Sequence, residues 1–198
     1  MRTLAQFLRV EFRGKGAQGY NDEMEYELKR SLRARTMRLA VHPDARVVVT
    51  APPFFEHGAI EQFVAEHSAW ISKHVERVRG RTVIRIRRNE ISELKKRALA
   101  FASARSLHFG AMYAFTFRKI SIRAQKSRWG SCSRAGNLSF NYKIAALPAL
   151  IADYIIIHEL CHLAHLDHSK EFWTLVEHAA PNYKDIRKKL RNMAFIFC

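Results

Sequence analysis

The stretch that decides the fold is IIIHELCHLAHLDH, residues 155–168, in which an H-E-x-x-H pattern lies inside an apolar run. His158 and His162 are four residues apart, so on a helix their imidazoles lie one turn apart on one face and reach one ion. Glu159 follows directly, and its carboxylate flanks the same point. Because ionisable side chains in a buried helix are costly unless they share a partner, the pattern predicts a Zn²⁺ site.

A catalytic zinc site needs a third protein ligand and an open fourth position. His168, six residues after His162, is the predicted third ligand, because a helix that ends near residue 165 or 166 lets the chain turn back toward the metal. His165 is the competing candidate, although it lies about 60° off the metal face of a straight helix. Asp167 and Glu171 are weaker candidates.

Length and composition predict one main globular body. The 198 residues, 48% of them hydrophobic, are enough for one substantial core, so we expect an N-terminal extension at 1–23 and a single domain at 24–198. No run of 18 apolar residues is present, which predicts no membrane partner. The three cysteines are an odd number without a C-x-x-C pair, so a disulfide framework is not expected and a reducing, cytoplasmic location is.

The chain is strongly basic, with a formal net charge of +16. Such a charge attracts polyanions and predicts nucleic acid or nucleotides as further partners of the basic surface. The region 77–97 is especially rich in Arg and Lys, and it reads either as a solvated loop leading into a helix from about 90 to 109 or as an anion-binding face. The oligomeric state does not follow from the sequence.

Apolar and polar residues alternate between Met24 and Val49, and a turn at 42–45 interrupts the alternation. This pattern predicts a three-stranded antiparallel sheet that ends at Pro52 and Pro53. The following apolar residues recur at helical spacing, which predicts one amphipathic helix over 58–78.

The second half predicts a strand over 115–122 with a bulge near Lys119, which forms a hairpin with a strand over 138–142. Pro148 then begins the metal helix, which is expected to run to Leu166, and two further helices follow. The fold class is therefore α+β, with an N-terminal antiparallel sheet, helices, and a C-terminal helical half that carries the H-E-x-x-H helix.

Three ordered motifs carry a family resemblance: RWGSCS at 128–133, HELCH at 158–162 and HSKEFW at 168–173. With them the chain resembles the YgjP-like family of zinc metallopeptidases, relatives of the WLM and SprT-like domains, over residues 26–180. The resemblance implies a zincin-like fold and the zinc ligands His158, His162 and His168. His165 stands where metzincins carry a glycine, and no Met-turn is evident, so that group is not assigned.

The expected activity is that of a zinc-dependent hydrolase, a metallopeptidase that uses a zinc-bound water activated by Glu159 on a peptide or protein substrate. The loop 128–133 offers Arg128, Trp129 and Ser131 as substrate-binding residues, along which an extended peptide could add as a strand. The alternative is a tight turn with Trp129 in the core. Candidates for stabilising the oxyanion, which the sequence cannot rank, are Arg128, Tyr142, His178 and Tyr183.

Two other functions compete with the peptidase. The same metal chemistry could hydrolyse nucleotides, with Arg and Lys residues binding the phosphates, although no Gly-rich phosphate loop is present. The chain could also be a nucleic-acid-binding protein that retains a structural zinc, and a fourth protein ligand would mark that case.

Overall fold

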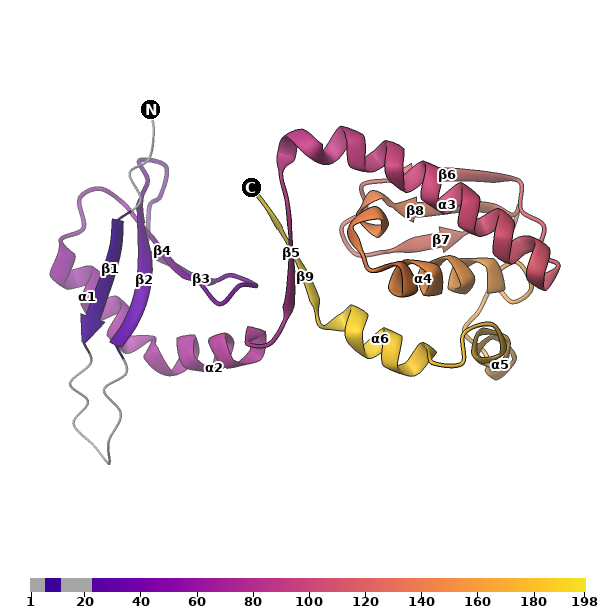
Figure 1. Cartoon of the computed structure of the whole chain (residues 1–198). Helices are drawn as coiled ribbons and strands as arrows, with labels where there is room; N and C mark the ends of the chain where they lie inside the picture. The colour runs from indigo at the N-terminus through magenta and orange to yellow at the C-terminus, as the bar shows by residue number, and fades with distance from the viewer. Residues whose placement is uncertain (1–5, 12–22) are drawn as a thin grey trace. The chain divides into compact units, whose positions relative to one another are not determined.

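Figure 1 shows the chain as a computed structural model, in which the described residues are 6–11 and 23–198. Contacts divide the chain into two compact units, residues 1–83 and 84–198, and each unit is described by itself. The division into an extension at 1–23 and a single domain at 24–198 stays a prediction. Residues 1–5 and 12–22 of the predicted extension lie outside the described residues, whereas residues 6–11 form a strand.

The first unit contains a four-stranded sheet with the order β1-β2-β4-β3. Its strands are β1 (Gln6–Glu11), β2 (Glu23–Arg30), β3 (Arg38–Val41) and β4 (Val47–Ala51). The β1/β2 and β3/β4 pairs are antiparallel, and the β2/β4 pair is parallel.

The predicted antiparallel meander is therefore wrong in its strand order, because β4 and not β3 lies beside β2. The physical reason is burial. Every β4 residue except Thr50 is buried, whereas β3 alternates between exposed and half-buried positions. A strand that is apolar on both faces gains most at the centre of a sheet, and a half-polar strand is tolerated at the edge. Alternation predicts which way side chains point, but not which strands are neighbours.

One face of this sheet is covered by two helices, α1 (His57–Glu66) and α2 (Ser68–Val78), where one helix was predicted. The break lies at His67, whose Nδ1 lies 2.8 Å from the carbonyl oxygen of Phe63. In a continuous helix that oxygen would accept a hydrogen bond from the His67 amide. The His67 amide donates instead to the Val64 carbonyl oxygen. The α-helical hydrogen bond of His67 is thus replaced by a shorter-range one, and the first helix ends there.

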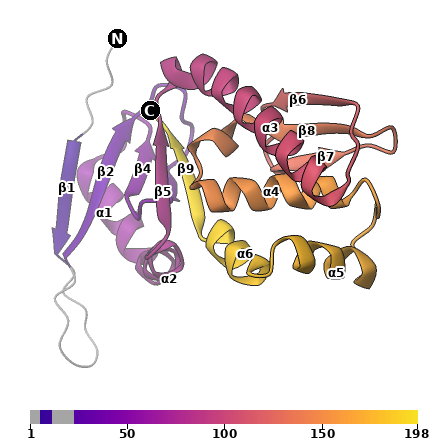
Figure 2. The same ribbon diagram turned by 45° about the vertical axis from the view of Figure 1, so that its right-hand side comes forward.

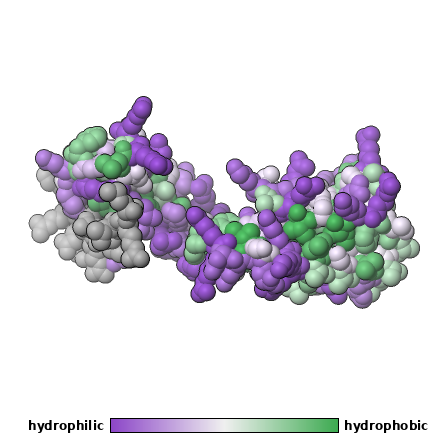
Figure 3. Space-filling model, turned by 90° about the horizontal axis from the view of Figure 1, so that it is seen from above, coloured by the Kyte–Doolittle hydropathy of each residue, from purple (hydrophilic) through white to green (hydrophobic). Residues whose placement is uncertain are grey.

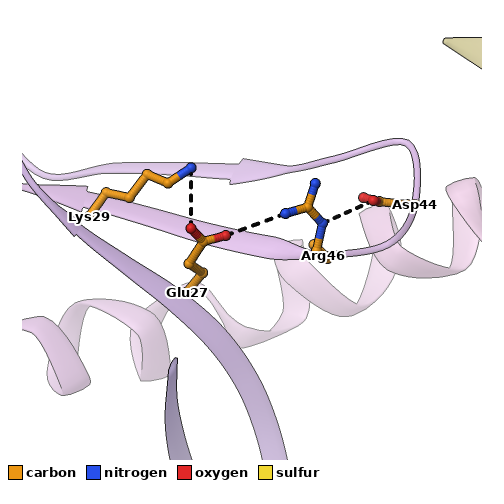
Figure 4. Close-up of polar contacts among 4 residues, drawn as sticks. All are labelled: Glu27, Lys29, Asp44 and Arg46. Carbon is orange, nitrogen blue, oxygen red and sulfur yellow. Dashed lines mark hydrogen bonds and ion pairs between the residues drawn. The ribbon is translucent and has the colours of Figure 1, made fainter. Parts of the chain in front are cut away.

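The opposite face of the sheet carries the ion pairs drawn in Figure 4. The side chain of Glu27, only 8% exposed, lies 3.3 Å from Lys29 Nζ and 3.5 Å from Arg46 Nη1. Arg46 Nε in turn donates to Asp44 at 2.9 Å. A carboxylate buried to this degree needs such partners. Glu27 lies on the face of β2 opposite to Tyr26 and Leu28, whose side chains are in the core.

The second unit contains the remaining elements, which Figure 2 shows from another side. At its boundary β5 (Thr82–Ile86) pairs with the C-terminal β9 (Met193–Phe197). A three-stranded sheet has the order β6-β8-β7. Its strands are β6 (Lys119–Arg123), β7 (Gly130–Cys132) and β8 (Asn137–Asn141). The α-helices are α3 (Ile91–Tyr113), α4 (Ala149–Cys161), α5 (Lys170–Ala179) and α6 (Tyr183–Arg191), and the 3-10 helices are η1 (Arg88–Glu90) and η2 (Tyr142–Ala146).

The predicted hairpin between 115–122 and 138–142 is wrong, because β6 and β8 are parallel and β7 forms the hairpin with β8. The strand begins only at Lys119, without the predicted bulge, and the rings of Phe115 and Phe117 pack on the core ahead of it. The mostly buried β8 takes the central place, as β4 does in the first sheet. Gly136, with a φ of 73°, makes the tight turn between β7 and β8.

The metal helix α4 ends at Cys161, about one turn before the predicted residue 166. His162 still has helical dihedrals, but the next amides donate to carbonyls three and four residues back as the chain turns away. The helix is buried almost all round, against α3, the sheet and α5 and α6. Small sheets combined with six α-helices confirm the α+β class.

On the face drawn in Figure 3, hydrophobic surface gathers in the second unit among projecting hydrophilic side chains. Exposed apolar residues on α3 are Leu99, Leu107 and Met112. Within the described residues, no helix is both long and apolar enough to cross a membrane.

The helices α3 and α4 are joined by a bidentate ion pair, in which Arg105 Nε and Nη2 each lie 2.7 Å from an oxygen of Asp153. The Arg105 guanidinium also lies 4.6 Å from the ring centre of Phe109. The side chains of Arg105 and Asp153 are 33% and 18% exposed. The pair is therefore intermediate between an exposed and a buried salt bridge. We predict that Asp153→Ala destabilises the second unit by roughly 1–2 kcal/mol.

Hydrogen exchange at the α4 amides measures this change. The matched control is Lys96→Ala, which removes an exposed ion pair on α3 with a 3.7 Å separation, and its effect should stay within about 0.5 kcal/mol. Equal effects of the two substitutions would contradict the role given to Asp153.

Candidate metal centre

Three imidazoles converge at the end of α4. The nitrogen atoms that His158, His162 and His168 offer as ligands all lie within 4.8 Å of one another. Nε2 of His158 and Nε2 of His168 are 3.2 Å apart. No carboxylate or cysteine joins this group among the residues that the structure describes.

The surrounding structure orients each ring. His162 stacks on the fully buried Phe172, with ring centres 4.4 Å apart. Its Nδ1 lies 2.9 Å from the backbone oxygen of His165, a contact that favours the Nδ1–H tautomer and leaves Nε2 free. Nδ1 of His158 is buried without a hydrogen-bond partner in the described part of the chain, so aromatic neighbours fix that ring. Among the Phe, Tyr and Trp rings around it, Phe172 is the nearest, with ring centres 5.0 Å apart.

His168 reaches the other two histidines because α4 ends early. After the turn at 162–164 the chain runs to Ser169, whose side chain caps α5 by accepting from the Phe172 amide. Of the rival ligands, Asp167 accepts from the Ser169 amide instead. His165 and Glu171 line a separate depression.

Burial controls the protonation of the two key groups of α4. The pKa of His158 is lowered to about 3, first by desolvation and then by the neighbouring histidines and Arg187. This histidine is therefore neutral, as a metal ligand must be. The pKa of Glu159 is raised to about 8 by burial, which outweighs the opposing effect of Arg128.

These groups open into a cavity of about 530 Å³. One wall is the segment from Arg128 to Cys132, which includes β7, and another comes from Arg187, Leu190 and Arg191 of α6. Gly130 lies against Glu159 so closely that a Cβ there would be 2.5 Å from Glu159 Cγ and 2.6 Å from its Oε1. The absence of a side chain at Gly130 is therefore what makes room for the carboxylate.

All three predicted substrate-binding residues line this cavity, namely Arg128, Trp129 and Ser131. The Trp129 ring also packs on Phe195, with centres 5.5 Å apart, so it serves the core as well. The backbone of the loop is held from behind by the buried Asn141, whose Nδ2 donates to Gln125 O at 2.7 Å and to Arg128 O at 3.1 Å.

The cysteines next to the site keep their protons. Burial, helped by Glu159, raises the pKa of Cys132 to about 11, and burial raises the pKa of Cys161 to about 12. Neither thiol belongs to the group of candidate metal ligands among the described residues.

Only one of the four predicted oxyanion candidates lines the cavity, namely Arg128. His178 lies in the separate depression, and Tyr142 and Tyr183 are buried outside the cavity lining. Three polar lining residues were missed, namely Tyr154, Arg187 and, one turn later on α6, Arg191. Tyr154 precedes His158 by four residues, so helical spacing could have found it, whereas no local signal points to Arg187.

Comparison with known proteins agrees with this geometry. A family model described as the YgjP-like metallopeptidase domain matches residues 35–94 and 85–193. No curated protein matches. The chain is similar to a crystal structure of the metallopeptidase zymogen of Pyrococcus abyssi abylysin, at 25% identity and with a TM-score of 0.42. The likeness covers 45% of this chain and 90% of that one. The family match spans most of the sequence, and the chain belongs to the YgjP-like metallopeptidase-domain family.

Proposed function

We propose that this chain is a zinc-dependent metallopeptidase in which His158, His162 and His168 hold Zn²⁺ and Glu159 is the general base. The observation that carries the proposal is the convergence of three imidazoles beside a buried carboxylate in one cavity. The family match supports peptide bonds as the substrate class.

The three histidines fit a zinc ion. Two nitrogens bound to tetrahedral zinc at about 2.0–2.1 Å lie about 3.3 Å apart, and the Nε2 atoms of His158 and His168 are separated by 3.2 Å. Imidazole is a donor that zinc accepts readily, and three protein ligands leave the fourth position that catalysis needs. Zinc bound there would act as a Lewis acid toward water and the scissile carbonyl.

Glu159 would handle the proton. Its carboxylate takes a proton from the attacking water and passes it to the leaving amine, a task that is most efficient for a group whose pKa lies near the working pH. Burial moves the pKa of Glu159 in that direction, to about 8. Close packing against Gly130 holds the carboxylate in place.

Tyr154 is the proposed donor to the developing oxyanion, beside Arg128. Its side chain lines the cavity one turn before His158. Burial raises its pKa to about 12, although Arg187 opposes the rise, so the hydroxyl keeps its proton and can donate. A hydrogen bond of this kind strengthens as negative charge develops on the carbonyl oxygen.

The substrate would bind along β7. This short strand lies at one edge of its sheet and pairs with β8 alone, so its other edge can accept an extended peptide as an added strand. Arg128, Trp129 and Ser131 would then contact the peptide.

One observation favours a second candidate, nucleotide hydrolysis. Three arginines line the cavity, Arg128, Arg187 and Arg191, and all three could bind phosphate. The structural-zinc alternative has less support, because the described residues group three ligands and no fourth. A cytoplasmic location stays part of the proposal, in keeping with three cysteines that form no disulfide.

The decisive experiment compares zinc-loaded wild type with Glu159→Gln on casein-like proteins and on a nucleotide panel, each with and without DNA. We expect wild type to cleave protein and the variant to lose at least about 100-fold in rate with its zinc content unchanged, because only the base is removed. Cleavage of nucleotides alone would favour the second candidate. Wild-type rates for Glu159→Gln would refute the role of Glu159.

Gly130→Ala tests the packing of the base. An added methyl group would collide with the Glu159 carboxylate and displace it, and misplacement by about 1 Å can cost about 100-fold in rate. We expect a loss of 10- to 100-fold with zinc affinity retained, measured on the best substrate of the panel. The control is Gly58→Ala, where the new methyl group meets no atom within 4 Å, and unchanged activity of both variants would contradict this account.

A further inference from the structure

A cationic side chain on α6 lies in the cavity with no role in the proposed mechanism. Arg187 is exposed to the cavity solvent and forms no ion pair with a carboxylate among the described residues. Arg191, one turn later on the same helix, lines the same cavity and also has no such partner in the described part of the chain.

Arg187 lies on the histidine side of the site. Its guanidinium lies over Trp173, whose ring centre is 5.8 Å from that of His158. Arg128 comes instead from the cavity wall that places Gly130 against Glu159. The two arginines therefore serve different parts of the cavity.

The guanidinium of Arg187 is held in place in advance. Its central carbon lies 4.5 Å from the ring centre of Trp173. Trp173 itself stacks on His168, with centres 5.6 Å apart, and on Tyr183, at 5.3 Å. A guanidinium fixed over an aromatic ring keeps its edge free for two parallel hydrogen bonds, and little side-chain entropy is lost when an anion binds.

The charge balance of the cavity makes an anion the natural occupant. A divalent cation bound by three imidazoles would bring two positive charges, more than the single Glu159 carboxylate could cancel. Arg128, Arg187 and Arg191 add three more. Like charges at this density repel one another unless a ligand compensates them, and they draw in anionic substrates.

We propose that Arg187, supported by Arg191, binds a carboxylate of the peptide substrate next to the scissile bond. The inference rests on the proposed peptidase function and specifies its substrate class. The carboxylate comes either from an acidic side chain or from a free C-terminus, because a guanidinium fork binds both in the same way.

The test measures peptide affinity of zinc-loaded Glu159→Gln, which is expected to bind peptides without rapid cleavage. Three peptides of one length are compared: one with a Glu and an amidated C-terminus, one with Gln in its place and an amidated C-terminus, and the Gln peptide with a free C-terminus. We expect at least one carboxylate peptide to bind 10-fold or more tightly than the neutral peptide, and the two arms identify the source of the carboxylate.

The same titrations with Arg187→Met added should abolish this preference and leave the affinity for the neutral peptide unchanged. Arg187→Lys keeps the charge without the planar fork and should retain only part of the preference, which provides a second reading if the Met variant folds poorly. Lys184→Met is the matched control, since it removes an α6 cation that pairs with Glu177 outside the cavity lining. It should change nothing.

Equal affinity for the three peptides, no measurable binding, or an equal loss for all peptides in Arg187→Met would overturn the inference. These outcomes differ from a failure of the proposed function. A carboxylate preference that depends on Arg187, found in a protein whose wild type cleaves no peptide, would uphold the subsite and refute the peptidase.

Discussion

The second unit depends on the meeting of three imidazoles at the end of a helix that is otherwise packed as core. Nine residues of α4 are buried, among them Glu159, so the polar groups of this helix are tolerated only if they share a partner. A metal ion satisfies three nitrogens at once, and the 3.2 Å separation of two of them matches what a tetrahedral ion requires. The surrounding elements can be understood as the supports of this arrangement.

Each element around the cavity contributes a different feature of the site. The strand β7 lies at an edge of its sheet and, at Gly130, leaves space for the Glu159 carboxylate. The early end of α4 lets His168 return, and the Ser169 cap begins α5 so that Phe172 lies against the imidazoles. The helix α6 contributes positive charge over Trp173. The inferred specificity and the chemistry thus come from separate elements around one centre.

The sequence predicted that three histidines come together at the end of α4. Spacing of four residues put His158 and His162 on one face, and the structure brings His168 to them. Patterns of alternation and helical spacing identified most strands and helices. They failed where the outcome depends on competition across the fold, because β4 and β8 took central places as the most buried strands. They also missed the local break at His67, whose amide donates to Val64 and not to Phe63. Arg187 could not be found, because only the packing of α6 brings it to the cavity.

The most direct test of the account is zinc X-ray absorption spectroscopy on the protein loaded with one equivalent of zinc. The account predicts three imidazole nitrogens at about 2.0–2.1 Å and one further light donor that the chain does not supply, as in catalytic zinc sites. A sulfur scatterer at about 2.3 Å would assign Cys132 or Cys161 to the metal. That result, or a shell with only two imidazoles, would contradict the central claim.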